Sequence, residues 1–122
     1  MKFLTLKLHG IIDYLAAIGL IAGPLMLFPA GTPGLVTAIP MIAGAALIIY
    51  SLITDYSVSA RRIIPFKLHL AIDFAAGAAF LILPFVLGLT GIPQIFYLVM
   101  GAAVVLAVFT SQTEENPAMM PG

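Results

Sequence analysis

The chain has 122 residues, of which 62% are hydrophobic and only 8% are charged, and its formal net charge at pH 7 is zero. So few polar residues cannot cover a globule in water, which excludes an ordinary soluble domain and favours a protein that lies in lipid. The neutral balance provides no basic surface for nucleic acid, and the lack of cysteine excludes disulfides, thiolate metal sites and thiol nucleophiles.

Four apolar stretches follow one another along the chain, at about residues 8–28, 35–53, 67–88 and 94–111. Each is close to the roughly 20 residues that a helix needs to cross about 30 Å of hydrocarbon. Short Gly/Pro segments join the first stretch to the second and the third to the fourth, which is typical of helical hairpins. We therefore predict one all-α domain, an integral membrane four-helix bundle of two tandem hairpins, with a short C-terminal tail, divided into residues 1–62 and 63–122.

The basic residues predict the topology. All of them precede the first stretch or lie between the second stretch and the first residue of the third: Lys2, Lys7, Arg61, Arg62 and Lys67. The positive-inside rule then places both termini in the cytoplasm and the protein in the inner (plasma) membrane as a multi-pass protein. We expect the first stretch to be a span and not a cleaved signal peptide, because it carries His9 and Asp13 and lacks an A-x-A site.

The two halves of the chain repeat each other. The octet KLHGIIDY, which begins at Lys7, returns as KLHLAIDF at Lys67, an offset of 60, and GAALII at 44–49 returns as GAAVVL at 101–106, an offset of 57. Two hairpins of one ancestry that enter the membrane in the same direction are related by a pseudo-twofold axis along the membrane normal. This axis brings the two copies of the octet to equal depth.

The repeated segments KLHGIIDYLAAIGLIAGPLMLF and KLHLAIDFAAGAAFLILPFVLG resemble the SPW-repeat family of small integral membrane proteins, over residues 7–111. The repeat unit of that family is a helical hairpin whose first helix ends in Ser-Pro-Trp, and many members open with K-x-H-x-x-x-D. Here the namesake positions read Gly23-Pro24-Leu25 and Leu83-Pro84-Phe85, so that only the proline is kept. The resemblance implies the hairpin fold and carries no biochemical activity with it.

Prolines and small residues suggest how the helices bend and pack. We expect Pro24 and Pro84 to mark the bend into the turn of each hairpin, and Pro40 to kink the second helix. Small residues gather at 43–46, 75–79 and 101–103, where they allow two backbones to approach closely. We interpret them as packing inside the bundle, and the alternative is a seam between copies of the chain.

Most of the residues that can carry chemistry belong to the repeated octet. His9 and Asp13, and likewise His69 and Asp73, are four residues apart and share one face of a helix. An ionised group in hydrocarbon costs about 2.5–3.5 kcal/mol, so these side chains should face the bundle interior. One interpretation is structural, with hydrogen-bonded pairs that join the first and third helices. The other is a metal site for zinc, iron or manganese, formed by all four residues.

Further interpretations of the same residues remain open. The two histidines could occupy the axial positions of a haem. The starts of the helices could bind an anion such as a lipid phosphate, and imidazoles that titrate could form a proton relay. No catalytic motif and no cofactor fingerprint is present. Serines lie at or beyond the helix ends without a plausible base: Ser51, Ser57, Ser59 and Ser111. An enzyme built from this sequence would have to depend on a metal.

Three function classes follow. The first is a non-enzymatic accessory, scaffold or sensor component of the plasma membrane. The second is a metal- or cofactor-binding membrane protein that uses the His/Asp quartet, and the third is an oligomeric transporter or channel. We expect the protein to lie in the lipid bilayer and not to bind nucleic acid. The expected partners are further copies of the chain or a larger membrane complex.

Overall fold

Four helices make up the described part of the protein. A computed structural model describes residues 4–54 and 63–111. In order they are α1 (Leu6–Leu27), α2 (Gly34–Leu52), α3 (Phe66–Val86) and α4 (Gly91–Thr110). The all-α four-helix architecture is thereby confirmed. The predictions made for Lys2, Arg61, Arg62, Ser57, Ser59 and the C-terminal tail fall outside the described residues.

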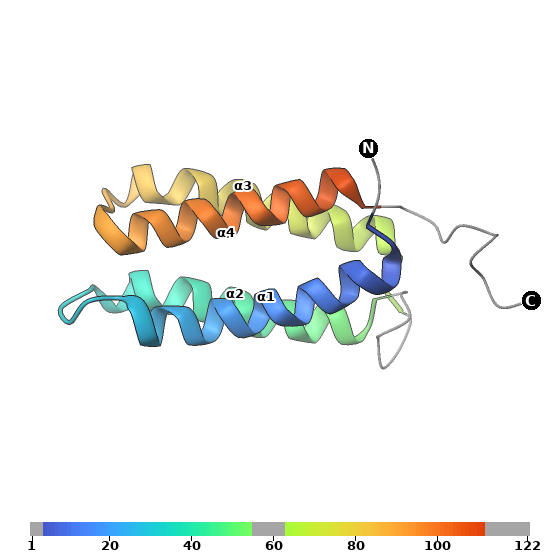
Figure 1. Cartoon of the computed structure of the whole chain (residues 1–122), viewed down its shortest axis with the longest axis horizontal. Helices are drawn as coiled ribbons and strands as arrows, with labels where there is room; N and C mark the ends of the chain where they lie inside the picture. The colour runs from blue at the N-terminus through green and yellow to red at the C-terminus, as the bar shows by residue number, and fades with distance from the viewer. Residues whose placement is uncertain (1–3, 55–62, 112–122) are drawn as a thin grey trace, which may run out of the picture.

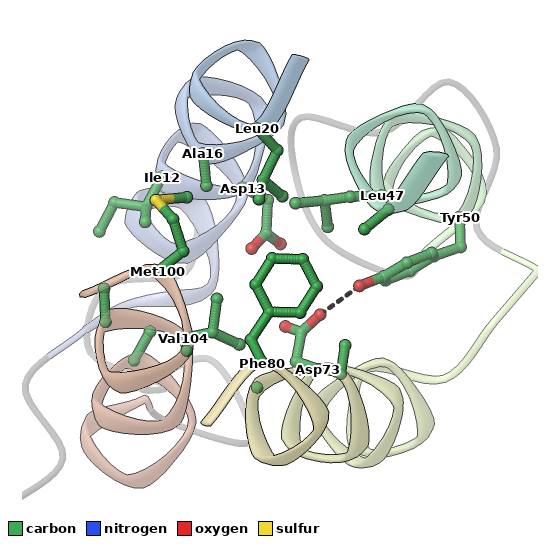
Figure 2. A pocket seen from close by; sticks show the side chains of 16 residues that line it. Ile12, Asp13, Ala16, Leu20, Leu47, Tyr50, Asp73, Phe80, Met100 and Val104 are labelled. Atoms are coloured by element: carbon green, nitrogen blue, oxygen red, sulfur yellow. Dashed lines mark hydrogen bonds between the residues drawn. The ribbon is translucent and has the colours of Figure 1, made fainter. Parts of the chain in front are cut away.

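The helices pack as two hairpins. α1 packs mainly against α2, and α3 mainly against α4, while fewer contacts join one hairpin to the other. α1 and α3 begin at the same end of the bundle (Figure 1), and a view along the bundle places them diagonally opposite each other (Figure 2). All four helices are long and apolar enough to cross a membrane, and large apolar side chains such as Leu15, Ile42 and Phe85 are exposed on the outside. By length and composition, the chain is therefore a multi-pass membrane protein.

Small residues bring the two helices of each hairpin together. A Cβ atom added to Gly44 would lie 2.8 Å from the carbonyl oxygen of Ala17, and one added to Gly101 would lie 2.8 Å from that of Gly77. The two contacts are equivalent in the repeat, because the offset of 60 relates Ala17 to Gly77 and that of 57 relates Gly44 to Gly101. These contacts support the interpretation that the small residues serve packing inside the bundle.

The prolines near the turns lie inside the last turn of α1 and of α3. α1 continues past Pro24 to Leu27, and α3 continues past Pro84 to Val86. Pro93, which the sequence assigned to a turn, lies in the first turn of α4. A proline costs little there, because the first N–H groups of a helix have no partner within it. For this reason α4 begins at Gly91, whereas the sequence predicted a start near residue 94.

A tyrosine of the second hairpin compensates for a proline of the first. Pro40, inside α2, has no N–H to donate to the carbonyl of Val36, four residues before it. The hydroxyl of Tyr97 on α4 donates to this carbonyl oxygen at 2.7 Å. Tyr97 is fully buried and stacks on Phe80, with ring centroids 5.1 Å apart. One side chain thus replaces a missing backbone hydrogen bond and connects the two hairpins.

Candidate metal centre

The His/Asp quartet lies inside the bundle, near the end where α1 and α3 begin. α1 starts after Thr5, whose hydroxyl accepts a hydrogen bond from the N–H of Leu8 at 3.1 Å and so caps the helix. The quartet consists of two residues on α1 and two on α3: His9, Asp13, His69 and Asp73. Both histidines are fully buried, and the two aspartates are 6% and 3% exposed. The prediction that these side chains face the interior is confirmed.

Each imidazole contacts both carboxylates. Nε2 of His9 lies 3.3 Å from Oδ1 of Asp13 and 3.1 Å from Oδ2 of Asp73. Nε2 of His69 lies 2.8 Å from Oδ2 of Asp13 and 3.1 Å from Oδ2 of Asp73. One nitrogen or oxygen atom from each of the four residues lies within 4.8 Å of the other three. Contacts within one helix and contacts between α1 and α3 therefore occur together.

A hydroxyl group from the end of a neighbouring helix contacts the other nitrogen of each imidazole. Nδ1 of His9 lies 2.5 Å from Oγ of Ser111, just after α4, and Nδ1 of His69 lies 2.7 Å from Oγ1 of Thr54, just after α2. The offset of 57 relates Thr54 to Ser111, so that both contacts belong to the repeat. The sequence did not predict a partner for Ser111, and a histidine from the other hairpin reaches it.

These hydroxyl groups determine which nitrogen carries a proton. Each one donates at 2.5 Å to the carbonyl oxygen four residues before it, Ser111 to Ala107 and Thr54 to Tyr50. A hydroxyl has a single proton, so towards the imidazole it can only accept. Both Nδ1 atoms therefore carry a hydrogen and donate it. Nε2 is then the nitrogen that each histidine presents to the carboxylates.

One contact does not follow the repeat. The hydroxyl of Tyr50 on α2 donates to Oδ1 of Asp73 at 2.5 Å (Figure 2). The offset of 57 places Ala107 at the equivalent position of α4, where a methyl group replaces the phenol. The ring of Tyr50 also lies 4.8 Å from the imidazole of His69, between ring centroids, so that this residue makes the surroundings of the α3 pair differ from those of the α1 pair.

An apolar cluster closes the quartet at the end of the bundle. The ring of Phe66 lies 5.1 Å from the imidazole of His9, edge to face, and 5.9 Å from that of His69, stacked. Phe66 packs with Leu6 and Leu70, which are also buried. Leu6 and Phe66 are the first residues of α1 and α3 and are related by the offset of 60. The quartet is therefore screened from the medium beyond this end.

A cavity of about 80 Å³ adjoins the quartet on its other side. All four helices line it, and the carboxylates of Asp13 and Asp73 reach it (Figure 2). Apart from these two and Tyr50, its lining is apolar, with small residues such as Ala16, Gly77 and Ala107.

The charges of the quartet limit what it can hold. Two carboxylates in an apolar bundle need about two compensating positive charges, since an isolated buried charge is costly. Two protons on the Nε2 atoms supply them, and so does one divalent cation bound by neutral imidazoles. A haem does not fit between the imidazoles, because both carboxylates lie within 3.3 Å of an Nε2 atom and fill that space.

Comparisons of the chain with protein-family models, with curated proteins and with solved structures found no match.

Proposed function

We propose that the protein is a membrane-embedded binder of a divalent transition metal, with His9, Asp13, His69 and Asp73 as its ligands. The observation that carries the proposal is the convergence of the four buried side chains, with both Nε2 atoms turned towards both carboxylates. Helical bundles hold metals in this way, by ligands that project inward from facing helices.

The dimensions of the quartet suit such an ion. Zinc binds His nitrogen and Asp oxygen at about 2.0–2.2 Å, which puts neighbouring ligand atoms of a tetrahedral site about 3.3 Å apart. The Nε2-to-carboxylate distances of 2.8 to 3.3 Å need only a small expansion, while the most distant ligand atoms, which lie within 4.8 Å of each other, need to move closer together. Nitrogen and oxygen donors suit zinc, iron(II) and manganese, and the hydroxyls on Nδ1 are the kind of outer partner that orients metal-bound histidines.

The same distances favour a second candidate. They lie in or near the range of N–H···O hydrogen bonds, so that protonated imidazoles would join the two hairpins without any metal. In that case the protein is an accessory, scaffold or sensor component of the membrane, and the quartet is the structural core of the bundle. Net charge does not separate the candidates, because both arrangements are neutral.

Both candidates place the protein in a plasma membrane with the quartet near the cytoplasmic face. The basic residues support this orientation, since Lys7 and Lys67 are exposed next to the quartet and basic residues favour the cytoplasmic side. The chain is then a pair of SPW-repeat-like hairpins in the lipid bilayer, either alone or as a homo-oligomer.

The deciding experiment is elemental analysis of protein purified without chelator. We expect about one divalent ion per chain, and its loss from the Asp13→Asn and His69→Ala variants. Each tenfold loss of metal affinity corresponds to about 1.4 kcal/mol. Ile11→Ala, an exposed position on α1, is the control and should keep the metal. Wild-type protein that takes up no ion from zinc-, iron(II)- or manganese-containing buffer would refute the metal site.

Thermal unfolding with and without chelator separates the two candidates further. A metal site predicts that chelator lowers the melting temperature of the wild type to that of Asp13→Asn, and leaves the variant unchanged. The structural candidate predicts no effect of chelator. It also predicts that Asp13→Asn lowers the stability of the protein only slightly, because hydrogen bonds in membranes average about 0.6 kcal/mol. His9→Ala should then cost more, since both carboxylates stay charged and lose a partner.

A further inference from the structure

The two carboxylate oxygens of Asp73 have different partners. The hydroxyl of Tyr50 donates to Oδ1 at 2.5 Å. Oδ2 lies 3.1 Å from Nε2 of His9 and 3.1 Å from Nε2 of His69. Oδ2 is therefore the oxygen that faces the other ligands of the proposed metal, while Oδ1 contacts the phenol.

The contacts of Asp13 follow another pattern. Its Oδ1 lies 3.3 Å from Nε2 of His9 and its Oδ2 lies 2.8 Å from Nε2 of His69, so that both oxygens face imidazoles. The residue of the second hairpin that corresponds to Tyr50 is Ala107, which has no hydroxyl to donate. The repeat is thus broken at the group that contacts the second oxygen of Asp73.

Several contacts with α3 hold Tyr50 in place. Besides the bond from its phenol to Asp73, its ring lies 4.8 Å from the imidazole of His69, between centroids. Its backbone carbonyl accepts from the hydroxyl of Thr54, which contacts Nδ1 of the same histidine. A hydrogen bond to a carboxylate is stronger than one between neutral groups, and the mostly apolar cavity beside it offers little replacement. We therefore expect the phenol to keep Oδ1 when Oδ2 binds an ion.

This contact limits the number of atoms that the quartet can offer to a metal. Each histidine supplies one nitrogen, Asp73 supplies one oxygen, and Asp13 supplies at most its two oxygens. A full octahedral set from the quartet would need Oδ1 of Asp73 as well. Zinc is satisfied with a tetrahedral set, whereas manganese is typical of octahedral sites that are rich in oxygen.

We infer that Tyr50 is a positioning residue that restricts Asp73 to one metal-binding oxygen and thereby favours zinc over manganese. The inference rests on the proposed metal site and adds the selectivity of that site. Manganese binds more weakly than zinc to most sites of nitrogen and oxygen donors. The effect of Tyr50 is therefore measured as a change in the ratio of the two affinities, and not as the preference itself.

Competition with a chromophoric chelator measures the affinities for zinc and for manganese. We expect Tyr50→Phe to lower the ratio of zinc affinity to manganese affinity about tenfold or more, because Oδ1 of Asp73 becomes available to the ion. Tyr97→Phe makes the same chemical change at a fully buried tyrosine whose hydroxyl donates to the carbonyl of Val36, and it should leave the ratio unchanged. If Tyr50 only stabilised the bundle, its loss would weaken the binding of both ions equally. An unchanged ratio in Tyr50→Phe, or the same change in Tyr97→Phe, overturns the inference.

Cobalt(II) reports on the coordination itself, because tetrahedral and five-coordinate cobalt absorb visible light more strongly than octahedral cobalt. The wild type and Tyr97→Phe should show strong bands, and Tyr50→Phe weaker ones. Tyr50→Leu, which also lacks the hydroxyl, serves in both experiments should Tyr50→Phe not fold. A weak, octahedral spectrum of the wild type contradicts the inference.

The two proposals fail in different ways. A wild type that binds neither zinc, manganese nor cobalt refutes the metal site, and this inference with it. A wild type that binds these ions, together with a Tyr50→Phe variant of unchanged ratio, refutes the role of Tyr50 alone.

Discussion

The orientation of two imidazoles depends on two hydroxyl groups at the ends of other helices. Ser111 and Thr54 accept from Nδ1 because their own protons go to backbone carbonyls. Without them, an imidazole is free to present either nitrogen to the carboxylates. We therefore regard both hydroxyls as positioning groups for the histidines.

The hydroxyl of Ser111 should matter to the metal, while that of its neighbour should not. Loss of such an outer partner typically lowers metal affinity about 10–100-fold, and we expect this range for Ser111→Ala. Thr110→Val is the control, because the hydroxyl of Thr110 also donates to a carbonyl four residues back, that of Leu106, but lies away from the quartet. Competition with a chromophoric chelator measures both affinities. Equal affinities for the two variants would show that Ser111 does not position His9.

The sequence predicted the quartet but not its neighbours, for physical reasons. A His and an Asp four residues apart in an apolar helix stand out, since lipid is a poor solvent for both. Ser111 is 102 residues away from His9 along the chain, and a hydroxyl at a helix end is common without any partner of this kind. The repeat could have indicated both hydroxyl groups, since the offset of 57 relates Ser111 to Thr54. Tyr50 has no such signal, because its counterpart is an alanine.

At the scale of the helices, the hydroxyl of Tyr97 donates to the carbonyl of Val36, to which Pro40 has no N–H to donate. Tyr97→Phe leaves the carbonyl of Val36 without this donor, and we expect a loss of about 1 kcal/mol in the free energy of unfolding. Pro40→Ala restores an N–H at the place where the carbonyl can accept it. In the Pro40→Ala background, Tyr97→Phe should therefore cost much less. Additive effects in this double-mutant cycle, measured by denaturation in detergent, would contradict the compensation.

The close approach of the helices in a hairpin depends on glycine. Gly44→Ala puts a methyl group 2.8 Å from a backbone oxygen of α1, which cannot move without the helix, and we expect a loss of about 1–3 kcal/mol. Gly19→Ala is the control, because no atom lies within 4 Å of the added Cβ. Its effect should be neutral or stabilising, since alanine favours the helix. Thermal unfolding of both variants tests the difference, and equal melting temperatures would refute it.

For the molecule as a whole, we expect the turns between α1 and α2 and between α3 and α4 to face away from the cytoplasm. The chain has no cysteine, so single cysteines can report on each side. Ala30 and Thr90 are exposed at the turns and avoid Gly31 and Gly91, whose positive φ angles disfavour other residues. In whole cells, an impermeant thiol reagent should label Ala30→Cys and Thr90→Cys but not Lys67→Cys. The reverse pattern would invert the topology.

The whole-molecule features differ in how far the sequence predicts them. Apolar length gives four helices, and Gly/Pro segments give the two hairpins, because both signals are local. The cavity between the hairpins is not local. It depends on small residues from different helices, such as Ala16 on α1 and Ala107 on α4, that meet only after folding. A sequence pattern shows that these residues are small, but not that the space beside them stays open.

The division of the quartet between two repeated hairpins has a consequence for the history of the protein. Each hairpin supplies one histidine and one aspartate, together with a hydroxyl for the histidine of the other hairpin. Two identical hairpins, associated as a symmetric dimer, would therefore build the same centre. An ancestor with a single hairpin needs nothing more than self-association. Duplication of such a hairpin would allow the two copies to diverge, and Tyr50 opposite Ala107 is a difference that no symmetric dimer of one sequence can have.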